Sequence, residues 1–196
     1  MAEDRLSGKG TLLLIGGSAG SLEVLLKVIP KLSTDIAFPI VIVIHRKDTS
    51  DSTLCDLLSS RTKLPVNEVE DKDALLPGHI YIAPANYHVL FESNRSFSLD
   101  VSEKVNYSRP SIDVAFESAA EAFGSGVTGI LLSGANSDGT NGLRKISELG
   151  GTAIVQLPAS ADVPFMPEHA IQHTRTDRIL DVSGITAYIN SMTAAG

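Results

Sequence analysis

The 196-residue chain contains one cysteine, no tryptophan and no apolar run long enough to cross a bilayer. A single cysteine excludes an internal disulfide, which is typical of a reducing compartment, so we expect a cytoplasmic protein. Residues 1–4 lack the basic start of a signal peptide, and no apolar segment follows them. We therefore predict no membrane insertion.

Basic residues are also scarce. The chain has 16 Lys and Arg against 23 Asp and Glu, a formal net charge of −7, and its basic residues form no run. Nucleic-acid binding usually requires a basic stripe, and aromatic residues, which supply stacking, make up only 5% of this chain. We therefore expect no nucleic-acid partner.

The chain does contain an alternation of short β-branched runs with helical patterns. This alternation predicts an α/β fold, a three-layer, doubly wound and mostly parallel sheet. Between Tyr87 and Val101 the period changes to two, which predicts an inserted antiparallel hairpin. The predicted strands are Leu12–Ile15, Ile40–Ile44, His79–Ala83, Gly129–Leu132, Thr152–Val155 and Arg178–Leu180, and the predicted helices are Leu22–Leu32, Thr53–Arg61, Ile112–Phe123, Gly139–Leu149 and Pro167–His173.

The length suits one medium domain with a continuous core. We predict a flexible N-terminus at residues 1–10, one domain at residues 11–192 and loose residues at 193–196. Cys55 lies within a predicted helix, among leucines. We interpret it as a packing residue rather than a reactive thiol.

The turn after the first predicted strand carries the strongest functional signal. The segment Gly16-Gly17-Ser18-Ala19-Gly20 joins a strand directly to a helical pattern. A serine flanked by glycines on such a turn has its hydroxyl held beyond the end of the sheet. The first amides of the helix point at the same space and supply donors for a developing oxyanion.

Two further polar residues follow the ends of predicted strands. His45 directly follows the second strand, and Asp138 lies after the strand Gly129–Leu132, just before a helix. Parallel strands end at one edge of the sheet, so we expect Ser18, His45 and Asp138 to share that edge. Taken alone, Asp138 is more simply a helix N-cap. Together the three residues predict a nucleophile, a base and an orienting acid.

Two other interpretations of the glycine-rich turn fit less well. Dinucleotide binding requires glycine where this chain has Ser18 and Ser21, and an acidic residue where the second strand ends in His45. The turn also fits the G-x-S-x-G elbow of α/β-hydrolases. That family orders its triad serine, acid, histidine, whereas the order here is Ser18, His45, Asp138.

The other histidines predict no metal centre. His169 and His173 are spaced to share one helix face, but Ala170 stands where a metalloprotease motif has its glutamate, and no third ligand is near. We interpret them as a solvated helix face and expect no metal and no cofactor. His88 follows a turn near another strand end, and we expect it to border the site.

Six segments occur in order along the chain: Ile15–Gly20, Val43–His45, Leu76–Pro84 with His88, Arg109–Val114, Leu132–Gly139 and Phe165–Pro167. Together they resemble the catalytic domain of the chemotaxis protein-glutamate methylesterase, the CheB type. The resemblance implies a serine hydrolase that removes methyl groups from glutamyl methyl esters on methyl-accepting chemoreceptors, often with deamidation of receptor glutamines. Matched by position, Ser18 is the nucleophile, His45 the base and Asp138 the orienting acid.

The remaining expected site residues form an oxyanion region and a substrate rim: Ala19, Ala135, Arg109 and His88. Arg109 precedes Pro110, which holds it extended. Its guanidinium is suited either to a substrate carbonyl or carboxylate, or to loop carbonyls, and the sequence favours neither.

The chain departs from the family pattern at Ala19, Arg46 and Ala135, where the family commonly has threonine, methionine and methionine. These departures bear on substrate choice more than on the reaction. They also leave open a catalytically weak module that binds a receptor or a signalling partner. The family commonly carries an N-terminal receiver domain; because only residues 1–10 precede the first predicted strand, we expect none in this sequence.

Overall fold

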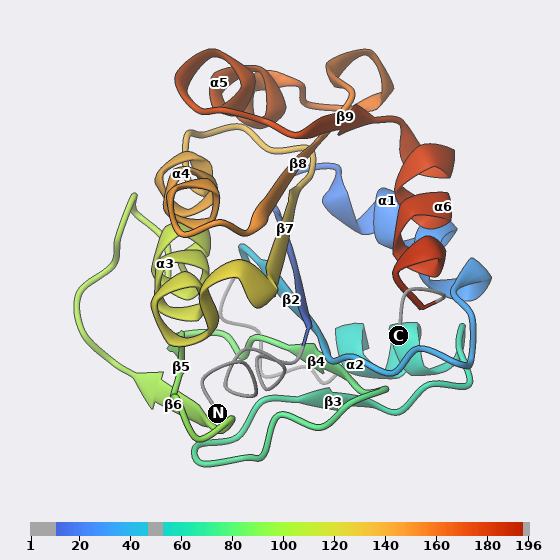
Figure 1. Ribbon diagram of the computed structural model, residues 1–196, viewed down its shortest axis with the longest axis vertical. Coiled ribbons are helices and arrows are strands. Elements are labelled where there is room, and N and C mark those ends of the chain that lie inside the picture. The colour runs from blue at the N-terminus through green and yellow to red at the C-terminus, as the bar shows by residue number, and fades with distance from the viewer. Residues whose placement is uncertain (1–10, 47–52, 194–196) are drawn as a thin grey trace, which may run out of the picture.

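The computed structural model describes residues 11–46 and 53–193. Seven parallel strands form one sheet in the order β3-β4-β2-β1-β7-β8-β9 (Figure 1). The strands are β1 (Leu12–Gly17), β2 (Ile40–Ile44), β3 (Val66–Glu68), β4 (Ile80–Ile82), β7 (Val127–Leu131), β8 (Thr152–Gln156) and β9 (Arg178–Leu180). A separate antiparallel hairpin consists of β5 (His88–Phe91) and β6 (Phe97–Asp100).

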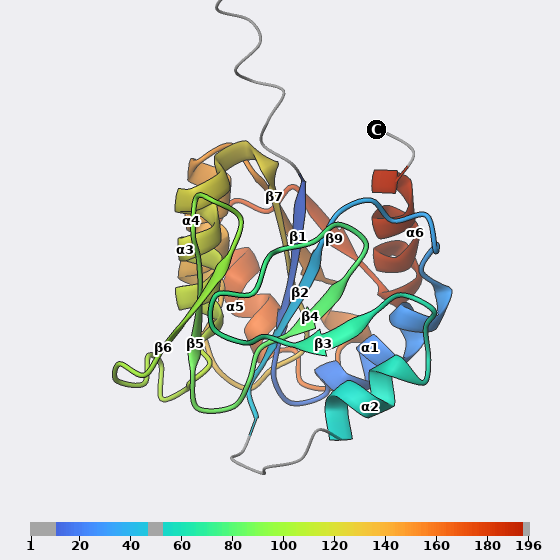
Figure 2. The same ribbon diagram turned by 90° about the horizontal axis from the view of Figure 1, so that it is seen from below.

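Helices cover both faces of the sheet (Figure 2). One face packs against α1 (Ser21–Val28), α2 (Thr53–Ser59) and α6 (Val182–Thr193). The other packs against α3 (Ile112–Phe123), α4 (Thr140–Glu148), α5 (Phe165–His173) and the hairpin. Three short 3₁₀ helices lie at Ile29–Lys31, Gly124–Gly126 and Pro158–Ser160. The predicted α/β architecture with its inserted hairpin is confirmed.

The central strands read as unbroken apolar runs because both of their faces are covered. Every residue of β1, β2 and β7 is buried. Parallel strands buried on two sides lose the alternation that marks a half-exposed strand. Two separate core clusters result, one on each side of the sheet. Cys55 is half-buried and packs against the second of these clusters, as predicted.

One strand and one α-helix were not predicted. The strand β3 is three residues long and carries Asn67 and Glu68 at the sheet edge, so no apolar period marks it. The helix α6 is rich in glycine, serine and β-branched residues, which are poor helix formers. It forms because Ile185 and Ile189 are buried against the layer of α1, and packing outweighs propensity.

Several helix boundaries differ from the predictions, most of all the end of α1. The predicted helix Leu22–Leu32 stops at Val28 and tightens into a 3₁₀ turn because Pro30 cannot continue an α-helix. Thr193, predicted to be loose, is the last residue of α6. The predictions for residues 1–10 and 194–196 lie outside the described residues. None of the helices in the described ranges has the length and apolarity that a bilayer crossing requires.

The order in which successive strands are added to the sheet reverses at β1. Successive connections run from β1 to β2 on one side, whereas β7, β8 and β9 extend the sheet on the other. In open parallel sheets the crevice at such a reversal, beyond the carboxyl ends of the strands, is where ligands bind. The residues that directly follow β1, β2 and β7 therefore lie at the expected position of a site.

Gly16 lies where the sheet meets the start of α3. A Cβ at this position would come within 2.5 Å of Ile112 Cγ2 and 3.1 Å of Phe116 Cζ. We expect Gly16→Ala to lower the free energy of unfolding by about 1–3 kcal/mol, because a packed core accommodates added volume poorly. Chemical denaturation measures this directly. An unchanged midpoint and slope would show that α3 is not packed this closely on β1.

Candidate active site

The turn after β1 places Ser18 beside His45. Strands β1 and β2 are paired in parallel, with Gly17 opposite Ile44, so the next residues along each strand are Ser18 and His45. The amide of His45 donates to the Gly17 carbonyl at 3.2 Å, which continues the ladder past the last paired residues. Ser18 is half-buried and lies at the carboxyl edge of the sheet. Ser18 and His45 therefore follow adjacent strands at the same edge of the sheet, as predicted.

The loop after β7 is hydrogen-bonded to the turn that contains Ser18. The Ser18 amide donates to the Ser133 carbonyl at 2.9 Å, and the Ser133 hydroxyl donates to the Ala19 carbonyl at 2.7 Å. Gly20 completes the turn with a φ of 81°, and a Cβ there would lie 2.6 Å from Ser133 Oγ. Glycine is required on both counts, the left-handed φ and the close approach.

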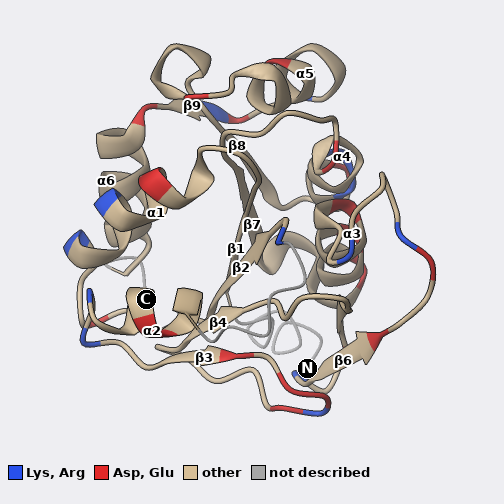
Figure 3. Cartoon of the chain, turned by 180° about the vertical axis from the view of Figure 1, so that it is seen from behind, with Lys and Arg blue, Asp and Glu red and all other residues tan. Residues whose placement is uncertain are grey.

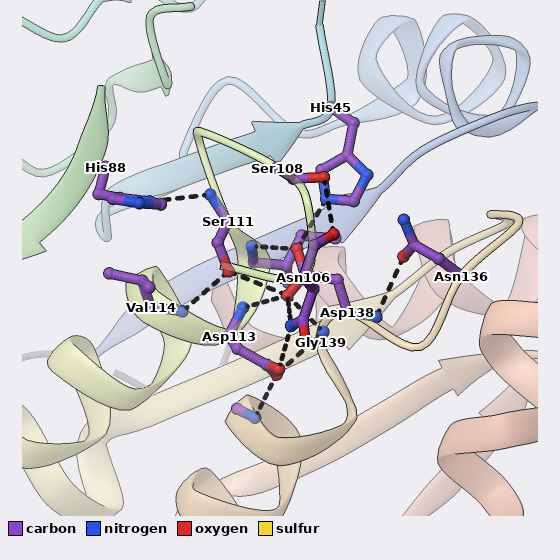
Figure 4. Close-up of polar contacts among 12 residues, drawn as sticks. His45, His88, Asn106, Ser108, Ser111, Asp113, Val114, Asn136, Asp138 and Gly139 are labelled. Atoms are coloured by element: carbon purple, nitrogen blue, oxygen red, sulfur yellow. Dashed lines mark hydrogen bonds and ion pairs between the residues drawn. The ribbon is translucent and has the colours of Figure 1, made fainter. Parts of the chain in front are cut away.

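His45 is held by Asp138. Its Nε2 lies 2.7 Å from Asp138 Oδ2; the imidazole side chain is 13% exposed and the carboxylate is fully buried. Figure 4 shows the ring directed at this carboxylate. With one ring nitrogen committed to Asp138, the other remains for a serine hydroxyl, which is the arrangement a general base requires.

Asp138 is saturated with hydrogen-bond donors. Its oxygens accept from six groups: the His45 ring, the Asn106 side-chain amide, the Ser111 hydroxyl and the backbone amides of Ile112, Asp113 and Gly139. The amides of Ile112 and Asp113 belong to the first turn of α3, so the carboxylate also lies at the positive end of a helix dipole.

This donor set controls the charge of Asp138. Burial raises the pKa of its carboxyl, but hydrogen bonds from His45, from the amides of Asp113 and Ile112 and from Asn106 outweigh burial and hold the pKa below its ordinary value. Asp138 therefore stays ionised while buried. A fixed negative charge next to His45 orients the imidazole and stabilises its protonated form during proton transfer.

Asp113 accepts hydrogen bonds from the N-terminus of α4, as Asp138 does from the N-terminus of α3. It lies in the first turn of α3, and its Oδ1 accepts from the amides of Gly139 and Gly142 at 2.9 and 2.7 Å, at the start of α4. Asp138, just before α4, binds the start of α3. Each helix thus supplies a carboxylate to the N-terminus of the other, and this exchange fixes the position of Asp138.

Asn106 joins the two carboxylates. Its Nδ2 donates to Asp113 Oδ2 at 2.8 Å and to Asp138 Oδ1 at 2.9 Å (Figure 4). Its backbone has a left-handed φ of 52°, which asparagine tolerates better than most residues. Burial, together with the nearby charge of Asp138, raises the pKa of Asp113 despite the hydrogen bond from the Gly142 amide. The pKa of Asp113 is therefore raised, whereas the pKa of the neighbouring Asp138 is lowered.

Two candidate donors to an oxyanion lie in the loops after β1 and β7. Within the described ranges, the amides of Ala19 and Ala135 donate no hydrogen bond, and both residues are exposed. One follows Ser18 directly, and the other lies in the loop between β7 and α4. The sequence prediction named both residues for the oxyanion region.

His88 is not on the rim, contrary to the prediction from the sequence. Its side chain is fully buried on β5; Nδ1 accepts from the Ser111 amide at 3.2 Å, and Nε2 donates to the Glu103 carbonyl at 2.9 Å. The expected strand end is a strand start, so the ring points into the interior. Ser111 is also fully buried, with its hydroxyl bound to Asp138. A serine without solvent access cannot receive a substrate carbonyl, so Ser111 acts as a support for Asp138.

Arg109 has the structural role that the sequence offered as one of two alternatives. Its Nη1 donates to the carbonyls of Val101 and Ser102 at 3.0 and 2.7 Å, which is the structural role. Its side chain also lines a cavity that reaches His45. The arginine is therefore held in place by its own loop while facing the site.

The histidines of α5 form no metal centre with other residues in the described part of the chain. His169 and His173 stack at 4.0 Å, with His169 Nδ1 bonded to Thr140 Oγ1. Across the described ranges, no three His, Cys, Asp or Glu side chains are placed to hold a metal ion. His173 is exposed, as expected for a solvated face, whereas His169 is half-buried, so the expectation holds for only one of the two.

Comparison with known proteins identifies the family. The family model described as CheB methylesterase matches residues 13–189. The chain belongs to the CheB methylesterase family. A putative protein-glutamate methylesterase/protein-glutamine glutaminase from Leptospira interrogans is 42% identical over 173 residues, covering 88% of this chain and 90% of the relative.

Relatives from other organisms agree. The protein-glutamate methylesterase/protein-glutamine glutaminase of Thermotoga maritima is 34% identical over 87% of this chain, which matches 51% of that longer protein. The crystal structure of the Thermotoga maritima CheB methylesterase catalytic domain superimposes with a TM-score of 0.89 at 32% identity, covering 93% of this chain and 98% of that one. The likeness thus extends over nearly the whole CheB-type fold described here.

The supports of Asp138 in the CheB-type site were not predicted. Nothing in the sequence indicated that Asn106, Ser111 and Asp113 hold Asp138, although the last two lie in the segment Arg109–Val114 that contributed to the resemblance. A serine followed by an acidic residue at a predicted helix start is an N-terminal signal. That signal indicates a cap for α3 and contains no information about a carboxylate arriving from Asp138.

Asp138→Asn tests the donor set. Either orientation of the new amide directs its NH₂ at groups that already donate, so we expect the free energy of unfolding to fall by about 1–3 kcal/mol at pH 7. The pKa of Asp138 is lowered in the folded protein, so its charge contributes stability above the ordinary carboxyl pKa and loses it as pH falls through the folded value.

The stability difference between the wild type and Asp138→Asn should therefore shrink as pH is lowered from 7 to 3. Urea denaturation of both proteins at several pH values gives this difference, and the other carboxyls largely cancel in the comparison. A difference that stays constant down to pH 3 would contradict the lowered pKa of Asp138.

Proposed function

We propose that this chain is a protein-glutamate methylesterase that also deamidates glutamine side chains, with methyl-accepting chemoreceptors as its protein substrates. The observation that carries the proposal is the ionised, buried Asp138 at 2.7 Å from His45. His45 directly follows β2, as Ser18 directly follows the paired strand β1. Family membership supports the same reaction. We place it in the cytoplasm, with residues 11–192 acting as one catalytic domain.

The residues support a two-step acyl transfer. The hydroxyl oxygen of Ser18 attacks the γ-carbonyl carbon of the glutamyl ester while His45 accepts the hydroxyl proton. The proton then passes to the departing oxygen, and methanol leaves. Water, deprotonated by the same imidazole, attacks the acyl-serine and releases glutamate. With glutamine the leaving group is ammonia, and the second step is identical.

Charge on the former carbonyl oxygen needs donors that are already in place. The unpartnered amides of Ala19 and Ala135 are the donors we assign to this oxyanion. Backbone amides suit this role because they are fixed by the fold and require no reorganisation during the reaction. Replacement of the family's usual side chains at these two positions by methyl groups leaves the amides themselves unchanged.

Ser18→Ala tests the nucleophile. The change is small and lies on a turn, so we expect the melting temperature to stay within a few degrees while methanol release falls by about a thousandfold or more. Reaction with a fluorophosphonate, followed by peptide mapping, should place the label on Ser18. Ser125→Ala, an exposed serine in the 3₁₀ helix after α3, is the matched control and should retain labelling and turnover.

The same experiment separates the second candidate function, a receptor-binding module without turnover. That candidate rests on the substitutions Ala19, Arg46 and Ala135 relative to the family pattern. An unactivated Ser18 would not react with the fluorophosphonate, and methanol release would be absent from the wild type as well. Labelling of a serine other than Ser18 would overturn the assignment of the nucleophile.

A further inference from the structure

A cavity of about 310 Å³ opens next to the catalytic base. His45 and Arg46, at the end of β2, line one side of it. The other side is the loop between β6 and α3, with Lys104, Tyr107 and Arg109. This loop extends outward from the fold between the hairpin and the first helix of its layer (Figure 1).

The cavity is positively charged in an acidic protein. Among the described residues, its lining includes Arg46, Lys104 and Arg109 and contains no aspartate or glutamate. The chain as a whole has a net charge of −7, and acidic positions lie on helices of both layers (Figure 3). Three basic side chains around one opening therefore stand out against the rest of the surface.

Most of this charge is not neutralised. Arg46 pairs with Glu68 at 3.0 Å. Within the described ranges, neither Lys104 nor Arg109 forms an ion pair, and the partners of Arg109 are two neutral carbonyls. Because those carbonyls fix its guanidinium, Arg109 presents a charge whose position is already set before any ligand binds.

The reacting ester cannot be the occupant of this cavity. The ester carbon must reach the Ser18 oxygen, and Ser18 is not part of the lining, whereas His45 is. The cavity therefore lies next to His45, beside the place where the ester reacts. A second part of the protein substrate would fill it when the ester is in place.

We propose that this cavity binds the carboxylate of an acidic side chain that neighbours the modified glutamyl residue on the substrate. Lys104 and Arg109 supply the charge, and Tyr107, 98% exposed, forms the outer wall. A carboxylate is the small anion a protein surface offers, and charge-assisted hydrogen bonds from lysine and arginine favour it. The inference rests on the proposed function and adds to it a preference for esters with acidic neighbours.

The test uses two synthetic helical peptides. Each carries one γ-methyl glutamyl ester, flanked in one peptide by glutamates and in the other by glutamines at the same positions. We expect the wild type to hydrolyse the glutamate-flanked peptide with a kcat/KM at least fivefold higher at low ionic strength. The preference should decline as salt is added, because exposed charges are screened.

Lys104→Glu should remove or reverse this preference. The matched control is Lys31→Glu, an exposed lysine in the 3₁₀ helix after α1 and outside the cavity lining, which should keep the wild-type ratio. The ratio between peptides is the readout, so a general loss of stability in one variant does not imitate the result. Equal kcat/KM values for the two peptides in the wild type would overturn the subsite and leave the esterase function intact.

A second measurement covers the case in which short peptides are not hydrolysed. An unesterified glutamate-rich peptide should slow fluorophosphonate labelling of Ser18 in the wild type and not in Lys104→Glu, and a glutamine-rich peptide should slow neither. Equal effects of both peptides on the wild type would contradict the subsite. Absence of any labelling of Ser18 would instead contradict the proposed function on which the subsite depends.

Discussion

The buried carboxylate of Asp138 is the constraint on which the site depends. A charge removed from water is tolerated only where hydrogen bonds replace the lost solvation. Six donors do so here, and five of them come from structural groups rather than from His45. The fold therefore secures an ionised carboxylate first, and the imidazole is oriented against it.

Stability and catalysis share the same atoms in this protein. Asp113, in the first turn of α3, accepts hydrogen bonds from the N-terminus of α4. Asp138, just before α4, accepts hydrogen bonds from the N-terminus of α3. Ordinary N-caps satisfy one helix each. Here the caps lock two helices together and also hold Asp138 beside His45. Displacement of either helix would move Asp138 away from His45.

The sequence predicted the triad because parallel strands end at one edge, and Ser18, His45 and Asp138 each follow such an end. It could not predict the supports of Asp138. Asn106 lies in a loop without periodicity, and its role depends on a left-handed backbone that places it between two carboxylates. His88 was wrongly predicted to lie on the rim, because the sequence does not indicate whether a polar side chain at a strand boundary points outward or into the interior. The helix α6 was missed because packing, rather than propensity, stabilises it.

A crystal structure of the protein after reaction with a fluorophosphonate tests the central claim most directly. The account predicts a covalent bond between phosphorus and Ser18 Oγ, with His45 between that oxygen and Asp138. It also predicts one phosphonyl oxygen within about 3 Å of the amides of Ala19 and Ala135. A phosphonate attached to another serine, or His45 turned away from Asp138 in the adduct, would contradict it.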